Sequence, residues 1–152
     1  MSLSRKISIK LQEQVRQRAN FLCEYCHTNE RWQYVRFTID HLIPTSEGGE
    51  DNFENLCLAC FHCNRRRSTK TKVIDKESGQ TVPLFNPRLH QWSEHFIWSN
   101  DGLYIIPLTD IGRITVETLD LNRARILNIR QADVIVERHP PAGDPVHIFN
   151  DT

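Results

Sequence analysis

Two Cys-x-x-Cys pairs in the first half of the sequence have the spacing of a metal site: Cys23 with Cys26, and Cys60 with Cys63. Thiolates at positions i and i+3 bind one ion when the backbone turns tightly between them, and two such pairs complete a closed tetrahedral shell. The alternative is a set of buried, reduced cysteines, but chance rarely places four of five cysteines in this pattern. We therefore expect these four cysteines to bind a structural Zn2+.

Three other residues near the pairs are weaker ligand candidates. Cys57 lies outside both pairs and is expected to be a small buried hydrophobic residue. His27 and His62 each adjoin a ligand cysteine but do not keep the i, i+3 spacing, so we do not expect either to replace a thiolate.

A second group of residues could do chemistry rather than hold structure. Asp40-His41 lies between the cysteine pairs, and Asn64 directly follows Cys63. Hydrolysis of a phosphodiester needs a base near neutral pH, for which histidine is suited, and a divalent cation held by oxygen ligands. The sequence by itself leaves open whether these side chains converge.

The elements that must position these residues can be predicted from local patterns. Ser8 is a candidate N-cap for a helix that ends near Ala19. Residues 34–39 alternate and are rich in β-formers, which predicts a strand ending at Asp40-His41. Residues 44–52 have loop composition, residues 53–58 lead to the second cysteine pair, and a helix is expected from Asn64 onward.

The second half of the chain has a different pattern. Residues 75–90 are loop-like, and residues 96–106 predict a β-hairpin with Asp101-Gly102 at its turn. Helices are expected over about 110–119, capped by Thr109, and over about 123–137, capped by Asn122, and the tail from His139 is expected to be irregular. The expected fold class is α+β, with a first domain at residues 1–74 and an extension at residues 75–152 that packs on it.

Composition excludes some classes of protein. The chain is 39% hydrophobic and 25% charged, which is typical of a soluble globular protein. No apolar run is long enough to span a bilayer, and the N-terminus has no signal pattern, so we expect a cytoplasmic protein with no membrane partner. The formal net charge is +0, but residues 1–72 are net basic and residues 73–152 are net acidic.

A basic cluster follows the second cysteine pair. Its members are Arg65, Arg66, Arg67, Lys70 and Lys72. Charge runs usually form a solvated helix face, but beside a metal-bound phosphate the cluster is expected to contact a DNA backbone. Which of the arginines does so cannot be predicted from the sequence.

Aromatic and histidine residues of the second half have structural explanations. Trp92, Phe96 and Trp98 could stack on bases, but large aromatics dominate small cores, so we expect them in the core of the extension. The remaining histidines show no ligand spacing and are expected to be structural or exposed: His90, His95, His139 and His147.

Several motifs together resemble the HNH endonuclease family. In order, they are Cys23-x-x-Cys26, Ile39-Asp40-His41-Leu42-Ile43-Pro44, Gly48-Gly49, Asn55-Leu56 and Cys60-x-x-Cys63-Asn64. The resemblance covers about residues 16–72. It implies a ββα-metal fold, in which a two-stranded hairpin and a helix surround one catalytic ion.

The resemblance also implies roles for individual residues. His41 would be the general base, Asp40 and Asn64 would bind the catalytic cation, and Asn55 would tie down the loop and orient His41. Asn64 departs from the histidine of the family name, and a neutral amide oxygen favours Mg2+ or Mn2+ over Zn2+. The implied products carry 5′-phosphate and 3′-hydroxyl ends.

The extension has a resemblance of its own. Residues 82–87, Val-Pro-Leu-Phe-Asn-Pro, and residues 92–96, Trp-Ser-Glu-His-Phe, look like the C-terminal extension of a bacterial, often cyanobacterial, HNH subgroup.

Three functions remain open at this point. The first is a metal-dependent endonuclease acting on double-stranded DNA, which the retained Asp40, His41, Asn55 and Asn64 favour. The second is a catalytically inactive zinc module that binds nucleic acid or protein. The third is a nuclease that needs targeting, with a protein partner or a homodimer formed through the acidic extension.

Overall fold

The computed structural model describes residues 7–148. The chain divides into two compact units between Arg65 and Arg66, so the division falls inside one short helix, α2 (Phe61–Arg67). The predicted domain boundary at residues 74/75 lies inside the second of these units. The two units are described separately below.

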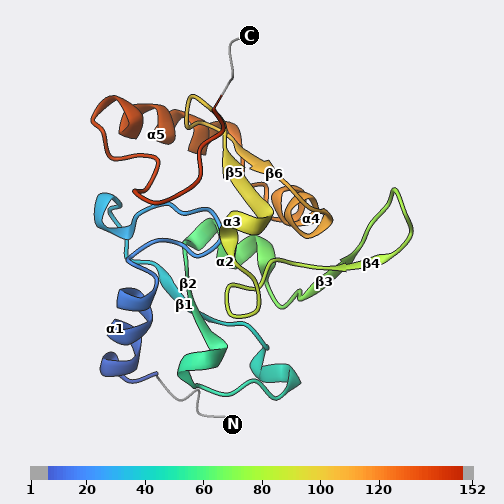
Figure 1. Ribbon diagram of the computed structural model, residues 1–152. Coiled ribbons are helices and arrows are strands. Elements are labelled where there is room, and N and C mark those ends of the chain that lie inside the picture. The colour runs from blue at the N-terminus through green and yellow to red at the C-terminus, as the bar shows by residue number, and fades with distance from the viewer. Residues whose placement is uncertain (1–6, 149–152) are drawn as a thin grey trace. The chain divides into compact units, whose positions relative to one another are not determined.

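The first unit is small and mixed. Its elements, seen in Figure 1 from blue to green, are α1 (Ile9–Arg18), η1 (Glu30–Trp32), β1 (Thr38–His41), η2 (Thr45–Glu47), η3 (Phe53–Asn55), β2 (Leu56–Ala59) and the start of α2. Helix α1 packs on β2 and η3. Its N-cap is the predicted one, because the Ser8 hydroxyl accepts a hydrogen bond from the Leu11 amide at 3.2 Å.

Strands β1 and β2 form an antiparallel pair whose register places the candidate catalytic residues. Asp40 lies opposite Cys57, and His41 lies opposite Leu56. All four residues of β2 are buried, whereas β1 is half-buried or exposed. Asp40 and His41 therefore lie on the accessible strand β1, which pairs with the buried strand β2.

The predicted strand at residues 34–39 is wrong in its bounds. Strand β1 begins only at Thr38 and continues through His41, so the Asp-His pair lies within the strand and not after it. Tyr34 and Val35 are exposed loop residues. Their β-forming character has no effect without a neighbouring strand to pair with, since β-propensity reflects packing on a sheet.

The second unit contains three short helices and two hairpins beyond the end of α2. Its elements are β3 (Lys72–Ile74), β4 (Thr81–Pro83), α3 (Trp92–His95), β5 (Phe96–Trp98), β6 (Ile105–Pro107), α4 (Asp110–Leu119) and α5 (Ala124–Ile135). Strands β5 and β6 confirm the predicted hairpin, and α4 and α5 confirm the two predicted helices. The fold class is α+β, as predicted.

Two elements of the second unit escaped prediction. The β3–β4 hairpin occupies part of the segment expected to be loop, and α3 precedes the β5 strand. Strands of three residues have too short a pattern to stand out in a sequence. They form because Val73 and Val82 pack with Ile114 of α4 in an apolar cluster.

The helix caps of this unit were predicted with mixed success. Thr109 caps α4, since its hydroxyl accepts from the Gly112 amide at 3.0 Å. Asn122 does not cap α5, whose N-cap is Arg123. The Asn122 side chain instead accepts from the Ile105 amide at 2.8 Å and donates to the Ile105 carbonyl at 2.9 Å, so a tertiary contact takes the place of the local one.

The predicted core of the extension is confirmed. Phe96 and Trp98 are fully buried and Trp92 is nearly so, which excludes them as base-stacking residues in this structure. The Trp98 indole donates to Asp144 at 2.8 Å, and its ring meets His139 edge-on at a centroid distance of 4.4 Å. The irregular tail is thus fastened to the core. Within residues 7–148 no helix has the length and apolar character that crossing a membrane requires.

Candidate functional site

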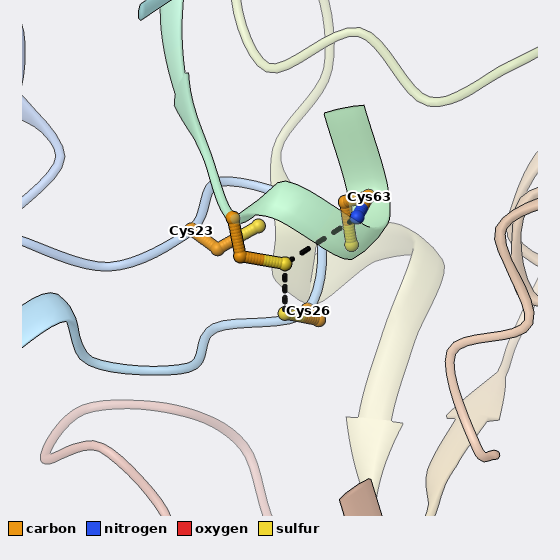
Figure 2. Close-up of side chains that lie close together, drawn as sticks. Cys23, Cys26 and Cys63 are labelled. Atoms are coloured by element: carbon orange, nitrogen blue, oxygen red, sulfur yellow. Dashed lines mark hydrogen bonds between the residues drawn. The ribbon is translucent and has the colours of Figure 1, made fainter. Parts of the chain in front are cut away.

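The four predicted cysteine ligands converge. Their sulfur atoms all lie within 4.8 Å of one another, and all four residues are buried. The Cys26 and Cys60 sulfurs are 3.7 Å apart, and the Cys63 amide donates to the Cys60 sulfur at 3.4 Å. Figure 2 shows the labelled Cys23, Cys26 and Cys63 side chains pointing toward a common centre.

The size of this cluster fits a metal ion. Metal–sulfur bonds of about 2.3 Å in a tetrahedron require sulfur–sulfur distances of roughly 3.8 Å, and the Cys26–Cys60 separation of 3.7 Å agrees with this value. Among the residues that the structure describes, this is the one group of three or more His, Cys, Asp and Glu side chains that could hold an ion. Neither His27 nor His62 belongs to it, and Cys57 is buried outside it, as expected.

Backbone hydrogen bonds build the two halves of the cluster. In the first knuckle the Cys23 amide donates to the Thr28 carbonyl at 2.9 Å, and the His27 amide donates to the Cys23 carbonyl at 2.9 Å. The second knuckle is the step from β2 into α2. Glu24 joins the halves, because its amide donates to the Leu58 carbonyl and its carboxylate accepts from the Leu58 amide, each at 2.8 Å.

The four buried cysteines perturb one another's ionisation. Burial raises the pKa of the Cys23 thiol, and hydrogen bonds to Cys23 and its neighbours raise the pKa of Cys63. Hydrogen bonds from the other three cysteines lower the pKa of Cys26. A buried cation would stabilise all four thiolates together, and this is the reason such closed sites bind metal tightly.

The loop from Ile43 to Asn55 is held by the side chain of Asn55. Its amide oxygen accepts from the Ile43 amide at 2.8 Å, and its nitrogen donates to the carbonyls of Ile43 at 3.1 Å and Glu50 at 3.0 Å. Gly49 is required in this loop, because a Cβ there would lie 1.7 Å from the Ile43 carbonyl oxygen. This arrangement closes the loop that follows His41.

His41 has a partner that the sequence did not single out. Its Nε2 lies 2.6 Å from the Asp51 Oδ1, and both side chains are partly exposed. Asp51 is one acid of a loop that also holds Glu47 and Glu50, so only the folded loop distinguishes it. Asp40 accepts from the His41 amide at 2.9 Å, which fixes its carboxylate beside its own strand.

Asn64, the last predicted site residue, follows Cys63 on α2. Its amide donates to the Cys60 carbonyl at 2.9 Å, and the residue is half-buried. Along the chain the order of elements is β1, β2, α2. Asp40 therefore lies on the element before β2, and Asn64 lies on the element after it. The cysteine cluster positions Asn64, because its neighbour Cys63 is one of the four converging cysteines.

The basic cluster is only partly available to a ligand. Arg65, Arg66, Lys70 and Lys72 are exposed, but Arg67 is 3% exposed. The Arg66 guanidinium also donates to the Thr118 carbonyl at 3.2 Å. Arg67 is therefore removed from the set of residues expected to contact DNA, since α2 turns its side chain inward.

Comparison with known proteins confirms the resemblance for one segment. The family model HNH endonuclease matches residues 23–70, which include all four clustered cysteines, Asp40, His41, Asn55 and Asn64. This segment is therefore similar to the HNH endonuclease family, and it contains the cysteine cluster that could hold a metal ion. No curated protein matches the chain.

Proposed function

We propose that this protein is a metal-dependent DNA endonuclease that hydrolyses phosphodiester bonds. The observation that carries the proposal is the side-chain network of Asn55, which closes the loop behind His41 inside a segment that matches the HNH endonuclease family. This network fixes the loop that brings Asp51 to His41.

Two kinds of metal ion belong to the proposal. The four cysteines bind Zn2+ as a closed structural site, because thiolate ligands and tetrahedral spacing suit that ion. Asp40 and Asn64 bind Mg2+ or Mn2+, which prefer oxygen ligands. When bound, this second cation supplies stabilisation of the negative charge that develops on the phosphate.

The protein side chains divide the remaining work. His41 takes a proton from the attacking water, a role suited to an imidazole near neutral pH. Asp51 holds the imidazole in orientation through the 2.6 Å contact, and Asn55 holds the loop that carries Asp51. The expected products are a 5′-phosphate and a 3′-hydroxyl.

The exposed basic residues are proposed to contact the phosphates of double-stranded DNA. These are Arg65, Arg66, Lys70 and Lys72. Each phosphate neutralised by such a side chain releases a counterion and steepens the salt dependence of binding. A cytoplasmic location and a protein partner or homodimer contact through the acidic extension stay part of the proposal.

The decisive experiment is cleavage of supercoiled plasmid in Mg2+ or Mn2+. We expect nicking or linearisation by the wild type and none by His41→Ala, with exposed His147→Ala as the matched control at wild-type activity. Asp51→Ala is expected to lower kcat strongly with little change in KM, because a positioning residue acts on the bound complex.

Two results would overturn this assignment. Equal cleavage by wild type and His41→Ala would show that His41 is not the base. DNA binding without cleavage by the wild type under every divalent metal would instead support the inactive zinc module.

The phosphate contacts have a separate test. Arg65→Ala combined with Arg66→Ala is expected to weaken DNA binding and to flatten the log–log salt slope by roughly 2. Exposed Arg138→Ala serves as the charge-matched control, and an unchanged slope in the double variant would remove these arginines from the interface.

A further inference from the structure

An exposed aromatic and aliphatic tip lies between the first cysteine knuckle and β1. Tyr34 is fully exposed, Val35 is 67% exposed and Trp32 is 42% exposed. Exposed apolar side chains that adjoin one another are candidates for a binding surface. Residues 31–36 are called the tip loop below.

A buried ion pair holds the two ends of the tip loop together. Glu30 accepts from the Phe37 amide at 2.7 Å, and Arg16 binds both Glu30, at 3.2 Å, and the Phe37 carbonyl, at 2.9 Å. The side chains of Arg16 and Glu30 are only 5% and 6% exposed. The exposed tip is therefore presented on a closed, anchored base and not on a loose segment.

The tip loop is close to the proposed catalytic strand. Val35 precedes Asp40 by five residues, which limits their separation to about 18 Å even in a fully extended chain. A surface hollow of ≈ 330 Å³ lies next to the base of the tip loop, and its lining includes Phe37, Thr38 and His41. The base of the tip loop and His41 therefore face the same hollow.

The charge around the tip favours a polyanion. Residues 31–39 contain two arginines and no acid. The Arg36 side chain is 64% exposed; it bonds at 2.9 Å to Glu13, whose side chain is 41% exposed, and lies 3.9 Å from Glu30. The Arg36–Glu13 contact is a surface pair that a phosphate can replace at little cost. The Arg31 guanidinium lies 4.1 Å over the Phe21 ring, which orients it beside the tip. Glu30 adds no net negative charge, because Arg16 neutralises it.

We propose that the tip loop is a DNA-deforming wedge, in which Tyr34 and Val35 insert against a base step near the phosphate cut at His41. Apolar side chains inserted between base steps unstack them and kink the duplex, and an aromatic ring stacks on a base of any sequence. Arg31 and Arg36 would bind the phosphates on either side. This inference rests on the proposed nuclease function and adds a substrate preference to it: deformable duplex over stiff duplex.

The test uses the full chain with His41→Ala, which can bind DNA without cutting it, and duplexes that carry 2-aminopurine at successive positions. Unstacking raises the fluorescence of this base. We expect binding in Mg2+ to raise it, and Tyr34→Ala with Val35→Ser to abolish the rise and weaken binding about tenfold. Leu89→Ala, an equally exposed apolar side chain of the second unit, is the control and should retain both.

In the cleavage assay, the tip variant with an intact His41 should lose most activity on a fully paired duplex and regain it on a duplex with a mismatch near the cut. Simple misfolding would not give this rescue. Metal content and circular dichroism should match wild type, because the tip side chains are in solvent.

The wedge proposal is overturned if the tip variant binds DNA and raises the 2-aminopurine fluorescence as much as His41→Ala alone does. In that case, cleavage by the wild type would still support the proposed nuclease function. The wedge proposal is also overturned if the substitutions abolish only self-association in sedimentation experiments, which would make the tip a protein interface. Absence of any DNA binding or cleavage by the wild type would instead remove the proposed function itself.

Discussion

The two units stabilise small cores in different ways. In the first unit, the buried residues around the short β1–β2 pair include the four cysteines together with Tyr25, Leu56 and Leu58. In the second, the core is aromatic: the Trp92 ring centroid lies 5.1 Å from that of Phe96 and 5.7 Å from that of Trp98. A segment as small as the first unit buries little apolar surface, so a metal ion held by its cysteine cluster would add stability that the second unit draws from its aromatic core.

Both units also bury arginine side chains, and Arg16 and Arg130 differ in their partners. Arg16 in the first unit forms an ion pair with Glu30. Arg130 in the second donates to the carbonyls of Leu103 at 2.8 Å and Leu121 at 2.7 Å, and its guanidinium lies 4.9 Å from the Trp98 ring centroid. Arg16 therefore anchors a loop through an ion pair, whereas Arg130 binds backbone carbonyls and lies against an aromatic ring. We therefore expect the stability of the first unit to depend more strongly on charged groups than the stability of the second unit does.

The strongest test of this comparison is removal of a cluster cysteine. Cys60→Ser is expected to lose the metal and unfold the first unit, since the ion contributes on the order of 10 kcal/mol in small zinc domains. Metal analysis combined with hydrogen exchange should show loss of protection in residues 9–59 and retained protection in α4 and α5. Cys57→Ser, a buried cysteine outside the cluster, is the matched control and should keep its metal.

The reverse experiment removes the aromatic core. Trp98→Ala should destabilise the second unit by about 3–5 kcal/mol, because it deletes a fully buried indole and leaves a cavity. Urea unfolding monitored by hydrogen exchange should show the loss in β5 and α5, with metal content unchanged. Equal loss of protection in both units would contradict the view that each unit is stabilised by its own core.

A smaller effect is expected from the buried ion pair. Glu30→Gln should destabilise the first unit by about 1.5–3 kcal/mol, because Gln keeps the shape and one acceptor but removes the charge facing Arg16. Chemical denaturation is the measurement, and exposed Glu13→Gln is the control. If the two substitutions lower the free energy of unfolding by the same amount, the Glu30 carboxylate does not contribute to stability through Arg16.

The smallest effect is pH-dependent and lies in the second unit. Hydrogen bonding to Arg113, at 2.7 Å, lowers the pKa of Asp75 below its ordinary value. Ionised Asp75 stabilises the folded protein at pH values above the pKa that this carboxyl has in the unfolded chain, near 4. This contribution is lost as the pH falls through the lower pKa that Asp75 has in the folded protein. Asp75→Asn should therefore reduce the urea midpoint at pH 7, and the difference from wild type should vanish in strong acid.

Local patterns predicted most helices and one hairpin correctly. The Ser8 and Thr109 caps, and the turn at Asp101-Gly102, depend on residues within a few positions of each other, so the sequence contains the whole interaction. The predictions that were wrong depend on distant partners. Asn122 is used by Ile105, and Tyr34 and Val35 find no strand to pair with.

The same distinction applies to the site. Cysteine spacing predicted the convergence of the four cysteines, because two i, i+3 pairs admit few other arrangements. Asp51 could not be identified, because its contact with His41 depends on how Asn55 folds the intervening loop. Arg67 was predicted to contact DNA with the rest of the basic cluster, because a charge run does not reveal which side of a short helix faces inward.

The amino-acid sequence by itself determined the chemistry available to this protein: four thiolates at ligand spacing, an Asp-His pair, and the caps and turns of its local elements. Tertiary structure alone decided which neighbours those residues have. Asp51 became the partner of His41, Arg16 and Glu30 closed the base of an exposed tip, and Arg67 turned inward. The physical reason is range, since ligand spacing and capping act over a few residues, whereas burial and charge pairing are set by segments that meet only in the folded chain.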